Sequence, residues 1–531
     1  MAAALPRPRA SALPALPALP AILAAALLLC LAALWNGQPF FYPDTPTYLR
    51  GAEMGVARLV GPHAFKPWLP AREDAAPAST DAPAATGLPS RQLKPLTSIE
   101  DKVVLAGRSV YYGALLYLGY VTGGMWLSVV LQALSVAYVL HLLIVSLWGL
   151  DGLRVVGVAA ALSVLSPLGV YTGFLMPDVF APLVILSVAL LAVYWQQLPG
   201  QHRWLLSALL LFALSTHASH FVLALLMLAL ALLARLISQR WRSLSGVGLM
   251  MIAACLGGAV AAEWAFNKAV TAAVGAPPLR LPHPMARLID LGPGTSYLKQ
   301  HCPAAGYAAC AYVQNFPTAW DDFLFSSDPG KGAFALADAD TKRRISAEQL
   351  AFVVDVLKHD PAGVIGGISA DVLRQLILFQ VDIWGYGETG IARFYQGRVP
   401  ASVLATMQQS RAARPQPFNR LLTLASYASV LASLMLAAWW WWRRTRATAR
   451  MPRTLPQRRF NDFAWIVIAG VVGNAVVCGT LASSLDRFQA RVVWLLPFLA
   501  LSALLLARIR HVSPSVLSSP PSSTSLQGAP P

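Results

Sequence analysis

Residues 421–460 read LLTLASYASVLASLMLAAWWWWRRTRATARMPRTLPQRRF, an apolar run followed directly by an arginine-rich loop. The run from 421 to 442 contains no charged residue and matches the length of a helix that crosses a bilayer. The loop carries seven arginines, namely Arg443, Arg444, Arg446, Arg450, Arg453, Arg458 and Arg459. Because arginine and lysine accumulate in cytoplasmic loops, this stretch predicts a membrane span whose carboxyl end faces the cytoplasm.

The composition of the whole chain agrees with a membrane location. Of its 531 residues, 56% are hydrophobic and 12% are charged, and the mean hydropathy is +0.55. A soluble domain carries about 25% charged residues. We expect an all-α polytopic membrane protein of about ten transmembrane helices. The predicted spans are 17–35, 123–147, 154–172, 176–196, 203–216, 218–238, 245–266, 421–442, 461–481 and 488–508.

The net charge of +17 invites comparison with nucleic-acid-binding proteins, but the basic residues are distributed differently. Arg235, Arg240 and Arg242 fill a second short loop, and other arginines lie at span ends that share the same face. This is the distribution that orients membrane proteins, so we expect membrane lipids and no nucleic acid as partners. It predicts a bacterial inner-membrane protein with both termini cytoplasmic, and 17–35 as an uncleaved first span.

The hydrophobic segments divide the chain into four parts. We expect an N-terminal membrane module over 1–266 with an outer loop at 36–122, and a mainly helical periplasmic domain over 267–420. A C-terminal membrane module over 421–511 and a disordered tail over 512–531 follow. The Ala/Pro-rich stretch from 67 to 89 within the first loop is also expected to be disordered, because it cannot bury enough apolar surface.

Two local features of the 267–420 segment support a folded periplasmic domain. Ser346 with Gln349 matches a capping box, which predicts that a helix begins at Ser346. Cys302 and Cys310 are eight residues apart in a polar loop. In an oxidising compartment they are expected to form a disulfide, the alternative being two unpaired thiols.

The first candidate functional segment is YPDTPTYLR, residues 42–50. Asp44 lies between Pro43 and Pro46, which predicts a stiff, extended backbone. A carboxylate fixed there can accept a proton from an acceptor group, hold a metal ion or pair with an arginine. The alternative is a turn aspartate whose side chain bonds its own backbone.

Two further segments carry charge on the predicted outer side. Arg108 precedes Tyr111 and Tyr112, and its planar guanidinium suits a phosphate, the alternative being contact with lipid headgroups. Asp178 opens the span at 176–196. It is either a second site carboxylate or an acidic residue favoured by the helix dipole.

Histidines and arginines complete the set of candidates. His217 and His220 share one face if their joint is helical, and they are either weak metal ligands or interfacial polar residues. Arg487 and Arg491 are four residues apart and share a helical face. Two outer arginines oppose the cytoplasmic bias, so we expect them to bind an anion or to pair with Asp44 or Asp178.

These features resemble the GT-C superfamily of integral-membrane glycosyltransferases, such as the protein O-mannosyltransferases and lipid A aminoarabinose transferases. The likeness rests on the aspartate just after the first span, the arginine-plus-tyrosine segment before the second, and the outer arginines near the last span. It covers residues 15–270 by topology and short motifs. It implies a polyprenyl-(pyro)phosphate sugar donor and a catalytic base at Asp44, with Asp178 as a supporting catalytic carboxylate.

The same resemblance implies that the outer arginines hold the lipid-linked phosphate. The expected substrate-binding residues are Tyr48, Arg108, Tyr112, His217, His220, Arg487 and Arg491. The acceptor stays open between a glycan, a lipid and a protein. The chain has no second acidic pair beside Asp44, so we assign no metal site or cofactor, and use of a divalent metal stays open.

Two other functions stay open at this point. A transporter or flippase of lipid-linked material predicts charged residues at mid-membrane depth, and the centres of the predicted spans hold few of them. A non-catalytic membrane assembly protein predicts tolerance to loss of Asp44 but not to loss of the 267–420 domain.

Overall fold

A computed structural model describes residues 18–61, 64–69, 101–326, 328–381, 394–414, 417–446 and 454–511. Every regular element in this part of the chain is a helix, and strand-like pairing is limited to isolated bridges at Phe40–Phe174 and Leu105–Leu279. The tail at 512–531 and most of the 67–89 stretch lie outside the described residues. The chain is thus an all-α polytopic membrane protein.

The amino-terminal half contains the elements α1 to α11. Their bounds are α1 (Ala18–Leu29), α2 (Leu31–Asn36), α3 (Thr45–Val60), α4 (Val110–Thr122), α5 (Trp126–His141), η1 (Leu142–Leu147), α6 (Gly152–Leu165), α7 (Leu168–Gly173), η2 (Pro177–Val179), α8 (Phe180–Tyr194), α9 (Gly200–Thr216), α10 (Ala218–Ile237), η3 (Gln239–Ser243) and α11 (Gly246–Val274).

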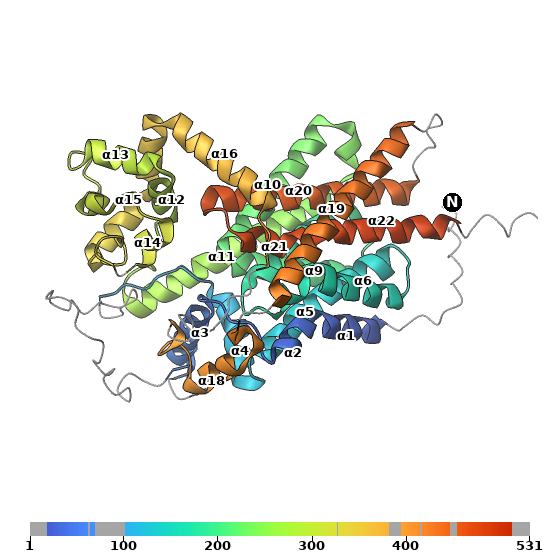
Figure 1. The fold of residues 1–531 in the computed structure, drawn as a ribbon, viewed down its shortest axis with the longest axis horizontal. Coiled ribbons are helices and arrows are strands. Elements are labelled where there is room, and N and C mark those ends of the chain that lie inside the picture. Colours follow the sequence, from blue (N-terminus) through green and yellow to red (C-terminus); the bar gives the residue numbers. More distant parts are fainter. Residues whose placement is uncertain are drawn as a thin grey trace, which may run out of the picture.

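The remaining elements form a separate domain and the last spans. They are α12 (His283–Leu291), α13 (Pro293–His301), η4 (Ala308–Asn315), α14 (Trp320–Phe325), α15 (Ala339–His359), α16 (Pro361–Ile377), α18 (Ala401–Gln409), η5 (Arg411–Ala413), α19 (Pro417–Arg446), α20 (Leu455–Leu481), α21 (Asp486–Val493) and α22 (Leu495–His511). Figure 1 shows α12 to α15 gathered beyond one end of the helix bundle, with α16 leading back to it.

Seven helical segments in the described chain are long and apolar enough to cross a membrane by length and composition. They are Trp126–Leu147, Pro177–Tyr194, Ala218–Ile237, Gly246–Val274, Pro417–Arg443, Leu455–Leu481 and Asp486–Ala507. The other three predicted spans coincide with shorter helices, α1, α6 and α9, of 12, 14 and 17 residues. α6 ends just before Pro167, which disfavours helical backbone in the residue ahead of it. A count of ten spans therefore stays a prediction.

The predicted domain at 267–420 divides into two parts. Buried residues from Leu281 to Val364 form a core of their own, and we call residues 279–377 the α12–α16 domain. Tyr395 and Met407 instead join the core of the bundle. The backbone N–H of Ala412 donates to the Asn36 side chain at 2.8 Å, which joins this second part to the end of α2. This packing could not be predicted from the sequence, because the contacting residues are more than 300 positions apart.

Two local predictions are wrong. The backbone after Asp44 is not extended but forms α3, because Pro46 falls in the first turn, where proline is well tolerated. Ser346 does not begin a helix, since α15 already begins at Ala339 under a cap from Asp338. The Ser346 hydroxyl instead donates to the carbonyl of Arg280 at 2.6 Å.

The cysteines divide by location. Cys302 and Cys310, which we expected to pair, form a disulfide that joins the end of α13 to η4. Cys30, Cys255 and Cys478 are buried free thiols within the bundle. The covalent link closes a short loop in the α12–α16 domain.

Close helix packing in the bundle depends on particular glycines of α11. A Cβ added at Gly248 would lie 1.9 Å from the carbonyl oxygen of Leu191 in α8. The N–H of Ser245, the cap of α11, donates to the carbonyl of Ala192 at 2.8 Å and fixes the same contact. A Cβ added at Gly257, two and a half turns further along α11, would meet nothing within 4 Å.

This difference provides a matched pair of variants. Gly248→Ala is expected to destabilise the protein by about 1–3 kcal/mol, because the backbones of α8 and α11 must separate. Gly257→Ala should be neutral or slightly stabilising, because alanine is the better helix former. Thermal unfolding midpoints of the purified variants in detergent compare the two; equal midpoints would contradict this packing.

Candidate functional site

A buried carboxylate with two arginines lies where α8 meets α21. Asp178, in η2, is 2% exposed. Arg487 Nε and Arg491 NH1 lie 3.5 and 3.4 Å from the same oxygen of Asp178, Oδ1. The spacing of four residues places both guanidinium groups on one face of α21. Two cations thus share one carboxylate in a region of low water access.

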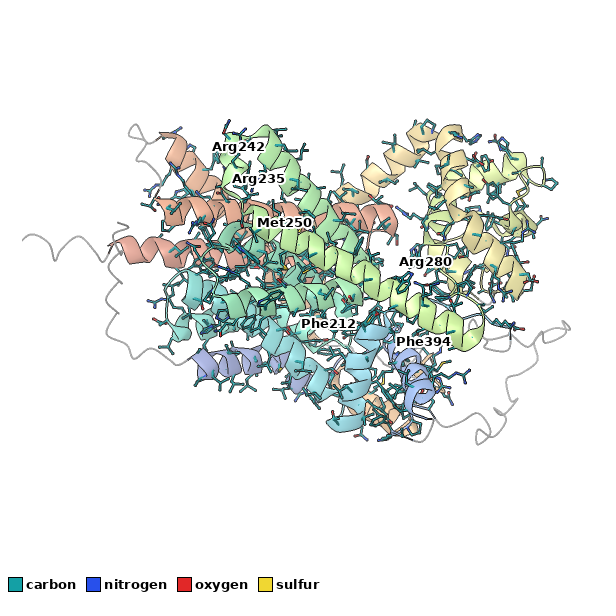
Figure 2. The ribbon with its side chains drawn as sticks, turned by 180° about the vertical axis from the view of Figure 1, so that it is seen from behind. Phe212, Arg235, Arg242, Met250, Arg280 and Phe394 are labelled. Carbon is teal, nitrogen blue, oxygen red and sulfur yellow. A yellow bond between two sulfur atoms is a disulfide. The ribbon has the colours of Figure 1, made fainter. Side chains whose placement is uncertain are left out.

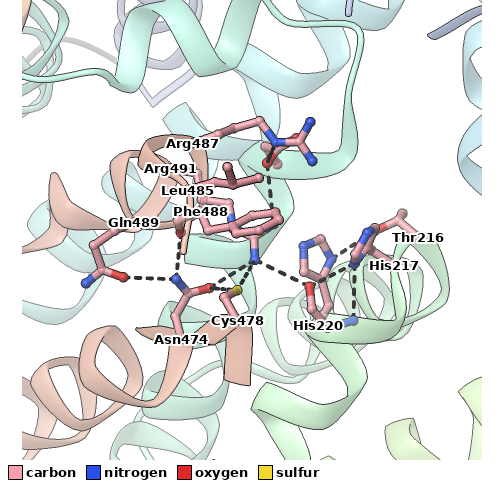
Figure 3. A network of polar contacts seen from close by, with 12 residues as sticks. Thr216, His217, His220, Asn474, Cys478, Leu485, Arg487, Phe488, Gln489 and Arg491 are labelled. Atoms are coloured by element: carbon pink, nitrogen blue, oxygen red, sulfur yellow. Dashed lines mark hydrogen bonds and ion pairs between the residues drawn. The ribbon is translucent and has the colours of Figure 1, made fainter. Parts of the chain in front are cut away.

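Arg491 is held on several sides by polar groups (Figure 3). Its NH2 group lies 3.0 Å from Asn474 Oδ1 and 3.3 Å from Ser219 Oγ. Asn474, in α20, also donates to the carbonyl of Phe488 at 2.6 Å. These contacts fix the guanidinium of Arg491 in place, so it serves as a structural member of the cluster. Arg487 differs, because its guanidinium lies 4.3 Å from the centroid of the Tyr42 ring.

A second ion pair, Asp44–Arg108, occupies the more accessible side of the site. Arg108 NH2 and Asp44 Oδ1 are 2.6 Å apart, and both side chains are about one quarter exposed. Asp44 precedes α3 without capping it, so its carboxylate engages Arg108 and not its own backbone. Burial lowers the pKa of Arg108, but Asp44 and Tyr48 raise it, and on balance the pKa is raised. Arg108 therefore stays charged.

Short backbone pairings bring the two ion pairs together. The N–H of Phe40 donates to the carbonyl of Gly173, and the N–H of Leu175 donates to the carbonyl of Phe40, both at 2.9 Å. The hydroxyl of Thr45 donates to the carbonyl of Leu175 at 3.1 Å. The residues just before Asp44 are thereby joined to those just before Asp178.

Tyr48 is a buried tyrosine on which the charges of both ion pairs act. Its side chain is buried, and its hydroxyl has no hydrogen-bond partner among the described residues. Burial raises its pKa, and the four charged groups of Asp44, Arg108, Asp178 and Arg487 all act on it. The Tyr48 hydroxyl is thus a buried, unpartnered polar group within the electrostatic field of both ion pairs.

The ring of Tyr112 packs against the ring of Tyr48. The two rings meet edge to face with centroids 5.1 Å apart. The Tyr112 hydroxyl donates to Gln132 at 2.8 Å, so it is occupied inside the protein. We therefore place Tyr112 behind the site, and Tyr48 within it.

His217 and His220 belong to the helix joint next to the site. His217 Nδ1 accepts from the N–H of Ser219 at 3.1 Å and caps α10. His220 Nδ1 contacts Thr216 Oγ1 and the carbonyl of Ala213, both at 3.0 Å. Burial lowers the pKa of His217 well below its usual value, and His220 and Arg491 lower it further. Both rings make hydrogen bonds within the joint between α9 and α10, and Ser219 in this joint contacts Arg491.

The described residues contain no group of three or more histidine, cysteine, aspartate or glutamate side chains that could hold a metal ion. The histidine pair has ring centroids 5.4 Å apart, and an Nδ1 of each already has protein partners. The arrangement offers cations and hydroxyls for an anion, together with one accessible carboxylate.

The sequence analysis missed His283, the first residue of α12. Backbone hydrogen bonds from Ala106 to Leu279 and from Leu279 to Val104, 2.9 and 2.7 Å long, join the segment before Arg108 to the segment before His283. Burial lowers the pKa of His283 to about 4, and Arg108 lowers it while Asp44 raises it. The sequence shows a histidine before Pro284, which is a suitable start for a helix. It does not show that this histidine lies near Arg108, which is about 175 positions away.

The fold and the site define a polytopic α-helical membrane protein with a buried cluster in which three arginines face two carboxylates. Comparison with family models, with characterised proteins and with solved structures gives no match to this chain. Function therefore has to be inferred from the site itself.

The low pKa of His283 predicts a pH-dependent stability. Between about pH 6.5 and 4 the unfolded chain binds a proton at this position that the folded protein does not, so stability falls as the pH falls. Thermal unfolding midpoints across this window should decrease less in His283→Gln than in the wild type. An identical decrease in both proteins would contradict a buried, neutral His283.

The two aspartates should differ in their effect on folding. Asp178→Ala leaves two buried arginines without a carboxylate and is expected to cost about 3–5 kcal/mol of stability. Asp44→Ala should cost about 1 kcal/mol or less, because its ion pair is partly solvated. Unfolding midpoints of the purified variants test this order, and a larger loss for Asp44→Ala would reverse the assignment.

Proposed function

We propose that this chain is a membrane glycosyltransferase that moves a sugar from a polyprenyl-(pyro)phosphate donor to an acceptor on the periplasmic side. The observation that carries the proposal is the charge balance of the site. Among the described residues, Arg108, Arg487 and Arg491 form ion pairs only with Asp44 and Asp178, which leaves a positive surplus beside a buried tyrosine hydroxyl. A phosphate is the anion that such arginines suit best.

The proposed reaction forms a bond between an acceptor oxygen or nitrogen and the anomeric carbon of the sugar. The bond between that carbon and the phosphate oxygen breaks, and the polyprenyl (pyro)phosphate leaves with the electron pair. Asp44 takes the proton from the acceptor, and Arg487 with Arg108 stabilises the charge that develops on the leaving phosphate. The polyprenyl chain stays in the bilayer beside the helices.

The contacts favour different roles for the residues that the sequence grouped together. Asp44 is the accessible carboxylate and the candidate base, whereas Asp178 is occupied by two arginines and holds them in position. Arg491 has partners in three helices, so Arg487 is the better candidate to contact phosphate. Tyr48 offers a buried hydroxyl without a hydrogen-bond partner among the described residues.

Orientation in the membrane is part of the proposal. Figure 2 places Arg235 and Arg242 at one end of the bundle and Arg280 near its other end, beside the α12–α16 domain. If the arginine-rich loops face the cytoplasm of a bacterial inner membrane, both termini are cytoplasmic and the site faces the periplasm. A lipid-linked donor would then enter from the outer leaflet.

The position of the charged groups favours an enzyme over a transporter. Asp178 lies at the start of the 177–194 segment, and Arg487 and Arg491 lie at the start of 486–507. Charges that mark a transport pathway are expected near the middle of the bilayer. The cluster instead lies at the ends of the spans, where a substrate from the aqueous side can meet a lipid headgroup.

The variant Asp44→Asn tests the proposal. It keeps the size of the side chain but removes the base, so we expect transfer to fall by at least about 100-fold while folding is retained. The purified full chain in lipid nanodiscs is supplied with a panel of polyprenyl-phosphate-linked sugars and a membrane extract as acceptor source. Release of polyprenyl phosphate is measured.

Asp151→Asn is the matched control. Asp151 forms an ion pair with Arg154 and caps α6, and asparagine keeps that cap. Activity should be unchanged in this control. Equal activity of Asp44→Asn and the wild type would overturn the role of Asp44. Movement of the lipid-linked probe across proteoliposomes without any transfer would favour a flippase, and absence of binding would favour an assembly protein.

A further inference from the structure

Residues 483–485, which precede the arginine helix α21, are hydrogen-bonded to the α12–α16 domain, and Asp486, the first residue of α21, is hydrogen-bonded to the segment just after it. Ser483 Oγ accepts from Trp320 Nε1 at 2.7 Å, and Ser484 Oγ donates to Asp371 at 3.3 Å. Leu485 and Asp486 are bonded as well, the latter accepting from the N–H of Gln380, just after α16, at 2.7 Å. Arg487 is the next residue.

Gln375 of α16 makes the most complete of these contacts. Its side-chain amide donates to the carbonyl of Leu485 at 2.8 Å and accepts from the N–H of Leu485 at 2.9 Å. Leu485 occupies the N-cap position of α21 and has no side chain that could cap the helix. Gln375 is fully buried, so both bonds are shielded from water and the backbone at the start of α21 is fixed on both its polar groups.

α16 is itself fastened to the bundle. The guanidinium of Arg287, which is 5% exposed, forms an ion pair with Asp371 and lies 3.5 Å from the carbonyl of Gly479. A Cβ added at Gly479 would lie 2.9 Å from the backbone of Val372. The end of α20 and the start of α21 therefore both lie against α16, with little space for movement between them.

We infer that the α12–α16 domain sets the position of Arg487 and Arg491 through Gln375, which makes Gln375 a positioning residue for the anion site. A shift of the cap of α21 moves both guanidinium groups relative to Asp178 at once, because they lie within its first two turns. The domain thereby controls how tightly the site holds phosphate. The ligand named in this inference rests on the proposed function, whereas the clamp on α21 does not.

Hydrogen exchange tests the clamp without any ligand. In the full chain in nanodiscs, Gln375→Ala should increase amide exchange across 485–493 by at least tenfold, because the two bonds to Leu485 are lost. Gln349→Ala is the control, since the Gln349 side chain bonds only within α15. Unchanged exchange across 485–493 in Gln375→Ala would overturn the inference. Ser484→Ala, which removes a single bond to Asp371, gives a milder second variant if Gln375→Ala does not fold.

Donor kinetics test the connection to the arginines. With the polyprenyl-phosphate-linked sugar that the wild type uses, Gln375→Ala should raise KM by about tenfold and change kcat little. In an Arg487→Ala background the same substitution should have no further effect, because both act through one contact. Independent, additive effects would overturn the link from Gln375 to Arg487. If the wild type transfers no sugar, the proposed function fails, and the exchange experiment still decides the clamp.

Discussion

The ion cluster of Asp178 with Arg487 and Arg491 is the constraint on which the rest of the site depends. Removing two arginines from water costs several kcal/mol for each, so α21 can occupy its place only while η2 supplies a carboxylate to it. The same carboxylate fixes where α8 begins. Backbone hydrogen bonds between residue 40 and residues 173–175 then fix the segment before Asp44 relative to the segment before Asp178. Three segments that are distant in sequence, α21, residues 173–178 and residues 40–44, are thus fixed relative to one another.

The cluster also relates stability to function. One carboxylate cannot satisfy two guanidinium groups fully, and in the described part of the chain the site adds one further carboxylate, Asp44, which pairs with Arg108. The arginines that carry the resulting positive surplus are held rigidly. Asn474 contacts Arg491, and Gln375 binds the backbone of Leu485, two residues before Arg487. The proposal of a lipid-phosphate ligand rests on this rigid surplus of positive charge near the ends of the apolar helices.

Sequence patterns predicted the parts of this arrangement that are local. Apolar runs located the helices, and the spacing of Arg487 and Arg491 placed them on one face. The extended backbone predicted after Asp44 was wrong because proline suits a first helical turn as well as an extended chain. His283 and the packing of residues 394–414 against the first loop could not be predicted, since they depend on contacts between segments more than 170 positions apart. Which arginine meets which aspartate required the three-dimensional arrangement.

The most direct test of the central claim is to locate a bound phosphate. The purified full chain in nanodiscs, saturated with a long-chain polyprenyl phosphate, can be imaged by cryo-electron microscopy. The account predicts phosphate density within hydrogen-bond distance of Arg487 or Arg108 and beside the Tyr48 hydroxyl, with the Asp178 cluster intact. Density for the phosphate at the arginine-rich end of the bundle, or an Asp178 separated from both arginines, would contradict it.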